Sequence, residues 1–101
     1  GSRREAEARA GAAESFWEAW DASPCEDISL MFVFFDGWPV FILRSKNQDN
    51  DRQVEVRFDD IGAEVIAGRN ARDRSATSRM SDVQCVASIP QLRAWFSRAD
   101  L

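Results

Sequence analysis

The side chains that could carry out chemistry in this chain are carboxylates, arginines, one lysine and two cysteine thiols, because its 101 residues include no histidine and no tyrosine. Without histidine there is no Ser-His-Asp or Cys-His nucleophilic system, no imidazole acid–base catalyst and none of the usual zinc sites. The composition therefore favours a protein that is not an enzyme and that holds no metal or cofactor. An enzyme that uses carboxylates and arginine alone is the last of the alternatives.

The two cysteines are too few for a disulfide scaffold. Cys25 stands beside Glu26 and Asp27, whose negative charges disfavour a thiolate. Cys85 lies in a segment that alternates like a strand. We expect both to be free thiols with structural roles in a reducing cytoplasm.

Two groups of carboxylates come near to recognised patterns. Asp49, Asp51 and Asp60 evoke a calcium loop, but its sixth position is Val54 instead of glycine and its twelfth is not a glutamate, so we reject it. The adjacent pair Asp59-Asp60 could serve general acid–base chemistry. Adjacent acids at the end of a strand are more typical of a turn or a helix cap, which is the interpretation that we favour.

The segment 69–82 is locally basic within a chain whose net charge is −4. Its basic residues are Arg69, Arg72, Arg74 and Arg79. Arginine suits carboxylates and phosphates, so one hypothesis is a clamp on an acidic partner. The alternative, a solvated loop, is the one that we favour. The acidic balance of the whole chain argues against binding to nucleic acid.

Aromatic residues are abundant for so short a chain, with seven phenylalanines and four tryptophans. A domain of this size buries only about 60–70 % of its surface, so some aromatic surface should remain for a partner. Trp38 lies next to a predicted turn, where a tryptophan is difficult to bury, and tryptophan is enriched at binding hot spots. Partial packing of Trp38 on the sheet is the alternative. The residues that we expect to contribute to binding are Phe16, Trp17, Trp20, Trp38, Arg69, Arg72 and Arg74.

A helix is predicted over 3–22, ended by Ser23-Pro24. Its apolar stripe is predicted to contain Ala6, Ala10, Ala13, Trp17 and Trp20, which recur at spacings of three and four. Gly1-Ser2 is typical of the remnant of a cleaved tag, so we expect one domain over 3–101.

A strand over 28–35 is apolar on both faces, which predicts a central strand covered on each side. Asp36-Gly37 predicts a tight hairpin into a second strand over 40–44, with Pro39 placed where no ladder hydrogen bond is needed. The segment 53–58 alternates, with Val54, Val56 and Phe58 inward. These three strands predict an antiparallel meander.

The rest of the chain gives weaker signals. The segment 59–68 fits a fourth strand or a short helix, and we favour the strand. We expect a loop over 69–82, a short last strand over 83–87, and a helix that begins at Ser88 with a capping box formed by Ser88 and Gln91. The predicted fold is therefore α+β: an antiparallel meander of four to five strands flanked by an N-terminal and a C-terminal helix.

No apolar run approaches the roughly 18 residues of a membrane span, and the first residues lack the layout of a secretion signal. We expect a cytoplasmic protein with no membrane partner. The first functional hypothesis is a protein–protein interaction module of the immunity, antitoxin or inhibitor kind, or a chain that associates with itself as a homodimer. The second is a binder of a small apolar ligand, in an aromatic pocket between the first helix and residues 30–35, gated by Trp38.

Overall fold

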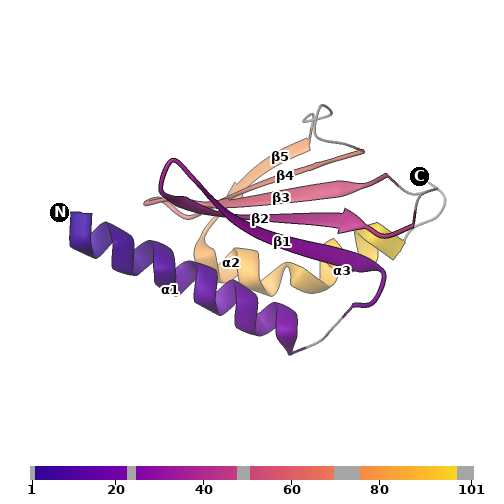
Figure 1. Ribbon diagram of the computed structural model, residues 1–101, viewed down its shortest axis with the longest axis horizontal. Helices are drawn as coiled ribbons and strands as arrows, with labels where there is room; N and C mark the ends of the chain where they lie inside the picture. Colours follow the sequence, from indigo (N-terminus) through magenta and orange to yellow (C-terminus); the bar gives the residue numbers. More distant parts are fainter. Residues whose placement is uncertain (1, 23–24, 48–50, 70–75, 98–101) are drawn as a thin grey trace.

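The computed structural model describes residues 2–22, 25–47, 51–69 and 76–97. Its elements are α1 (Ser2–Asp21), β1 (Ile28–Phe35), β2 (Trp38–Ser45), β3 (Gln53–Phe58), β4 (Ala63–Gly68), β5 (Ala76–Met80), α2 (Asp82–Ala87) and α3 (Ile89–Ser97). The five strands form one antiparallel sheet, and the three helices lie along one side of it (Figure 1). The predicted α+β meander is confirmed, and so is the choice of a strand for the segment that became β4.

The strands follow one another across the sheet in the order β1-β2-β3-β4-β5. The β1–β2 hairpin turns at Asp36 and Gly37, which have φ angles of 52° and 81°. Two consecutive residues of positive φ form a type I′ turn, whose twist matches that of the strands. Pairing of β2 with β3 begins at Val40, so Pro39 lies just outside that ladder and its missing N–H breaks no pair, as predicted.

Alternate residues of the sheet face the helices and form the core. Val54, Val56 and Phe58 of β3 are fully buried there, which confirms the predicted alternation. The other core residues of the inner strands are Phe41 and Leu43 of β2 and Ala63 and Val65 of β4. No described helix covers the opposite face of the sheet.

The buried face of α1 is centred on Phe16, and the predicted stripe is wrong at Ala10 and Trp17, which are both exposed. Phe16 is fully buried, and its ring lies 4.6 Å from that of Phe41 and 5.9 Å from that of Phe58. Trp17 is 43 % exposed. The predicted stripe and the observed face share Ala13 and Trp20, so the helical period alone could not decide between the neighbours Phe16 and Trp17.

The predicted central position of 28–35 is also wrong, because β1 is a margin of the sheet. Four of its eight residues are large hydrophobics with substantial exposure. The reason is topological: in a meander each strand pairs with its sequence neighbours, so the first strand has a neighbour on one side only. The apolar residues on both faces of β1 therefore do not mean that the strand is buried.

The C-terminal part differs from prediction in two ways. Residues 76–80, expected in a loop, form β5, and the predicted strand over 83–87 is the helix α2. The capping box belongs to Ser81 and Gln84: the Gln84 N–H donates to Ser81 Oγ at 3.1 Å, and the Ser81 N–H donates to Gln84 Oε1 at 2.9 Å. The motif Ser-x-x-Gln occurs twice within residues 81–91, and the second copy begins at Ser88, which is the C-cap of α2. A helix does begin directly after Ser88, as predicted.

Replacing Phe16 by alanine should lower the free energy of unfolding by about 3–5 kcal/mol, because the substitution leaves a cavity among aromatic rings. Trp17→Ala should cost only about 1–2 kcal/mol, since nearly half of this indole is already in water. Urea unfolding of the two variants measures both values. An equal or larger loss for Trp17→Ala would contradict the assignment of the buried face.

Candidate functional site

The described part of the chain concentrates its exposed hydrophobic side chains on β1 and on the neighbouring face of α1. We call this the β1 edge surface and define it as Met31, Phe32, Phe34 and Phe35 of β1 together with Trp17 of α1. Phe34 is 66 % exposed and Phe35 58 %, and the other three side chains are each more than a third exposed. Scattered exposed hydrophobics need no explanation, but a group gathered on one strand and the helix beside it is typical of an interaction site.

The β1 edge surface wraps around the margin of the sheet. Phe32 lies opposite Phe41 and Phe34 opposite Pro39, which places both on the face that carries the helices. Their rings are 5.0 Å apart and in edge-to-face contact. Met31 and Phe35 point to the other face because successive side chains of a strand alternate. An occupant that used the whole surface would have to contact both faces.

The backbone of β1 also offers unpaired groups. In a two-residue hairpin the residues that flank the turn, Phe35 and Trp38, exchange two hydrogen bonds, and such pairs then alternate along the ladder. The N–H and C=O groups of Met31, Val33 and Phe35 therefore point toward β2, and those of Leu30, Phe32 and Phe34 point outward. No strand among the described residues pairs with this side of β1.

Edge strands usually carry a device that prevents another chain from pairing with them, such as a charged residue, a proline or a bulge. The β1 segment ISLMFVFF has no charged residue and no proline, and its pairing with β2 runs without a bulge from Ile28 to Phe35. The opposite margin, β5, carries Thr77, Ser78 and Arg79 instead. The two margins of the sheet are therefore chemically different, and only β1 is suited to receive an apolar strand.

A groove of about 330 Å³ lies between α1 and the β1–β2 hairpin, open to solvent. It is lined by Ala13, Glu14, Trp17, Phe32 and Phe41. The ring of Trp17 lies 6.0 Å from that of Phe41, and the ring of Phe32 lies 4.9 Å from it. Phe41 thus forms the floor of the groove, and the groove adjoins the β1 edge surface through Trp17 and Phe32.

Trp38 does not gate this groove, contrary to the pocket hypothesis. It is the first residue of β2 and lies opposite Phe35, so its indole is on the face of the sheet away from α1. Its side chain is half-buried there. On the same face, the guanidinium of Arg57 lies 5.3 Å from the centre of the Phe35 ring.

The other residues expected to bind a partner are dispersed. Phe16 and Trp20 belong to the core. Trp20 is also held by Arg93, whose guanidinium lies 4.4 Å from its ring and donates to its backbone carbonyl. Arg69 is exposed at the end of β4, whereas Arg72 and Arg74 lie outside the described residues. The structure thus brings Trp17 to the edge surface but none of the other predicted residues that it describes.

Met31, Phe32, Phe34 and Phe35 are not among the residues expected to bind a protein partner, although residues 30–35 were expected to line a ligand pocket and two further signals pointed to an exposed strand. The run of apolar residues over 28–35 was recognised, and so was the meander. Combining the two places an uninterrupted apolar strand at a margin, where its side chains cannot all be covered by the same chain.

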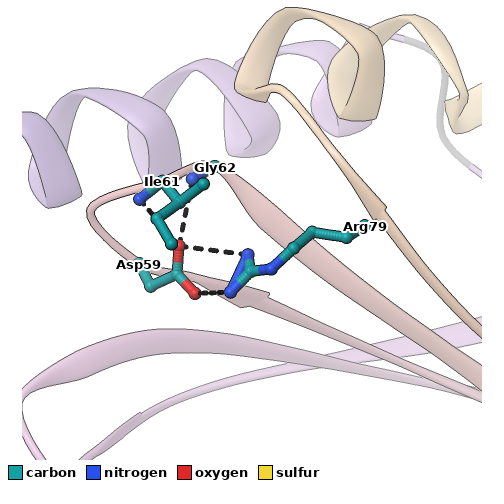
Figure 2. A network of polar contacts seen from close by, with 4 residues as sticks. All are labelled: Asp59, Ile61, Gly62 and Arg79. Carbon is teal, nitrogen blue, oxygen red and sulfur yellow. Dashed lines mark hydrogen bonds and ion pairs between the residues drawn. The ribbon is translucent and has the colours of Figure 1, made fainter.

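Asp59, considered as a catalytic carboxylate, is instead the centre of a turn (Figure 2). Its Oδ1 accepts hydrogen bonds from the N–H groups of Ile61 at 2.9 Å and Gly62 at 3.0 Å, and both carboxylate oxygens bind the Arg79 guanidinium. Gly62 is required here, because a Cβ atom would collide with the Met80 carbonyl oxygen. The carboxylate therefore fastens the β3–β4 turn to β5, in keeping with the interpretation as a turn.

Replacing Asp59 by alanine should cost about 1–3 kcal/mol, since two turn N–H groups and the Arg79 guanidinium lose their acceptor. Asp60, its exposed neighbour, provides the matched control: Asp60→Ala should change stability by no more than about 0.5 kcal/mol. Thermal or urea unfolding measures both. Equal effects of the two substitutions would contradict the structural role of Asp59.

Both cysteines are free thiols, as expected. Cys85 is fully buried under α1, and this burial, with a smaller contribution from the charge of Asp82, raises the pKa of its thiol to about 12. A thiol that stays protonated is neither a nucleophile nor a metal ligand. Within the described ranges, no group of three or more cysteine, aspartate or glutamate side chains is arranged to hold a metal ion.

The Cys85 thiol should make stability fall at alkaline pH. An unfolded cysteine ionises near pH 8.5, whereas folded Cys85 keeps its proton to about pH 12, so between these values the unfolded chain has lost a proton that the folded chain retains. From about pH 9.5 to 11, wild type should therefore lose roughly 1.4 kcal/mol per pH unit more than Cys85→Ala. Urea unfolding across this range measures the difference. Parallel pH profiles would contradict the raised pKa.

None of the helices in the described residues is both long enough and apolar enough to cross a membrane. No family model matches the chain, and comparison with curated proteins and with solved structures gives no match. The function has to be argued from the β1 edge surface itself.

Proposed function

We propose that this chain is a non-catalytic protein-binding module and that its contact surface is the β1 edge surface. The observation that carries the proposal is an apolar edge strand with aromatic side chains exposed on both faces and no protective charge or proline. In this mode of recognition a partner adds a strand to β1. Main-chain hydrogen bonds supply affinity, and alternate side chains supply specificity.

The size of the surface supports an interaction site. With 150–250 Å² for a fully buried aromatic side chain, the exposed parts of its five residues amount to about 500 Å² of apolar area. The largest patch on an ordinary monomer is about 300–600 Å² and is often functional. Burying this area would supply on the order of 10 kcal/mol of gross hydrophobic free energy, before the costs of association.

The shape of the surface favours a protein over a small molecule. The outward N–H and C=O groups of Leu30, Phe32 and Phe34 form a regular row, which only another extended backbone matches. A small ligand in the groove beside Trp17 would leave Phe34 and Phe35 in water. We also propose a reducing compartment such as the cytoplasm, which the two free thiols support.

A small apolar ligand is the second candidate function, favoured by the groove between Trp17, Phe32 and Phe41. Ligand pockets usually enclose most of the ligand and hold about 300–1,000 Å³. This groove is at the lower limit of that range and open on one side, so it suits one ring or side chain. A side chain of a protein partner would fill it equally well.

A charge on β1 should abolish binding of the partner. Phe34→Lys places an ammonium on the most exposed ring position of the strand, so we expect at least a tenfold loss of affinity. The measurement is affinity capture from lysate of the source cells with tagged wild type, Phe34→Lys and Val83→Lys, followed by titration with each purified protein that is captured.

Val83→Lys is the matched control, because Val83 is 79 % exposed on α2, away from β1. A partner that is lost with Phe34→Lys and retained with Val83→Lys fulfils the proposal. The proposal fails if Phe34→Lys binds every captured protein, including untagged copies of the chain, with the same affinity as wild type and Val83→Lys do. Circular dichroism of the variants verifies that each is folded.

A further inference from the structure

We infer that the strand added to β1 is β1 of a second copy of this chain, in antiparallel orientation about a two-fold axis at Phe32. This inference rests on the proposed function, since it names the partner of the same surface. The result would be one continuous sheet of ten strands, with the helices of both copies on the same face.

The residues of β1 whose N–H and C=O groups point outward permit antiparallel pairing centred on Phe32. The outward groups belong to Leu30, Phe32 and Phe34, and these three positions are symmetric about Phe32. In the dimer, Phe32 pairs with Phe32 of the second copy, and Leu30 pairs with Phe34 on each side. Each of these three pairs is a hydrogen-bonded pair that exchanges two N–H···O=C bonds. A shift by one residue would place each of these groups opposite a residue whose N–H and C=O point toward its own β2, and the hydrogen bonds across the seam would be lost.

The side chains across the seam are compatible in the same register. On the helix face, Phe32 meets its own copy and Leu30 meets Phe34, which are apolar and aromatic cross-strand pairs. On the other face, Met31 meets Val33. No charge lies within β1, so self-pairing brings no like charges directly opposite each other within the strand. The apolar side chains on the helix face of β1, which are out of place at a free margin, are suited to the centre of a ten-stranded sheet covered by helices on that face.

The packing of the helices leaves room for the second copy. α1 packs over β2 and β3, and Trp17 and Phe32 border the open groove beside β1. The core layer of each copy ends at Phe32 and Phe34, and the second copy continues it with its own Phe32, Phe34 and Trp17. The exposed rings would thus cover one another.

The area is adequate for a reversible dimer. Both copies together would bury at most about 1,000 Å² of apolar surface, because Met31 and Phe35 lie on the face without helices, with the backbone groups in addition. Specific interfaces bury about 1,200–2,000 Å² in total, and weaker transient ones less. We therefore expect a dimer that dissociates on dilution, with a dissociation constant on the order of micromolar.

Cysteine cross-linking tests the register directly. In the Cys25→Ser background, Phe32→Cys places two thiols opposite each other with Cα atoms about 5.5 Å apart, inside the range that a disulfide bridges. Ser29→Cys, an exposed position of the same strand, places them about 20 Å apart because residue 29 lies opposite residue 35. Mild oxidation of the folded protein should give a cross-linked dimer with Phe32→Cys and not with Ser29→Cys or Val83→Cys.

Sedimentation velocity over a range of concentrations tests the affinity and does not require a cysteine. Wild type and Val83→Lys should change from one chain to two as concentration rises, and Phe34→Lys should remain one chain with at least a tenfold weaker association. Any of three results overturns the inference: a single-chain mass for wild type at every concentration, a dimer unaffected by Phe34→Lys, or equal cross-linking of Phe32→Cys and Ser29→Cys.

The inference and the proposed function can fail separately. If wild type is always a single chain but a different protein binds it in a manner that depends on Phe34, the second copy is wrong and the protein-binding module stands. If no protein of either kind depends on Phe34, both are wrong.

Discussion

A single layer of helices can cover only the strands beneath it, and a five-stranded sheet is wider than the helices of this chain. α1 packs over β2 and β3, while α2 contacts α1 and β4. The contact of Phe16 with Phe41 and Phe58 fixes α1 over the middle of the sheet, where three aromatic rings share one buried cluster. As a result the part of β1 next to the hairpin stays outside the covered area, and Phe32, Phe34 and Phe35 remain largely exposed.

The two margins of the sheet meet this constraint in different ways. β5 is polar, and Arg79 on it is bound by Asp59 of the β3–β4 turn (Figure 2). That contact pairs the Arg79 guanidinium with a carboxylate and holds β5 to the β3–β4 turn. β1 is apolar and lacks any comparable charge, so its exposure leaves an unfavourable contact with water. Contact with another chain would remove this surface from water, which is why we propose binding as the function.

Much of the fold could be predicted from sequence because local signals and long-range structure agree there. Asp36-Gly37 demands a tight turn, and the alternation of Val54, Val56 and Phe58 places one face in the core. The errors arose where a local pattern had two structural solutions. Ser-x-x-Gln occurs twice within residues 81–91, and only the folded structure, with Cys85 packed in the core, shows that the first of these copies caps α2.

The candidate site was predictable only in part. Trp17 was predicted both in the apolar stripe of the helix and among the binding residues, whereas the aromatic residues of β1 were assigned to a covered strand. An apolar residue in a sequence indicates a side chain that is more stable away from water. It does not indicate whether the same chain or another chain covers that side chain. For Phe34 and Phe35 that distinction depends on strand order, which is a property of the whole sheet.

The most direct test of the account is residue-resolved amide hydrogen exchange along β1, measured in dilute solution. If β1 is an open margin, the N–H groups of Met31 and Val33, which are bonded to β2, should exchange slowly, and those of Phe32 and Phe34, which point outward, should exchange far faster. This alternation should fade as concentration rises. Uniform slow exchange across Met31 to Phe34 at the lowest concentration would mean that another part of the same chain covers β1, and would contradict the account.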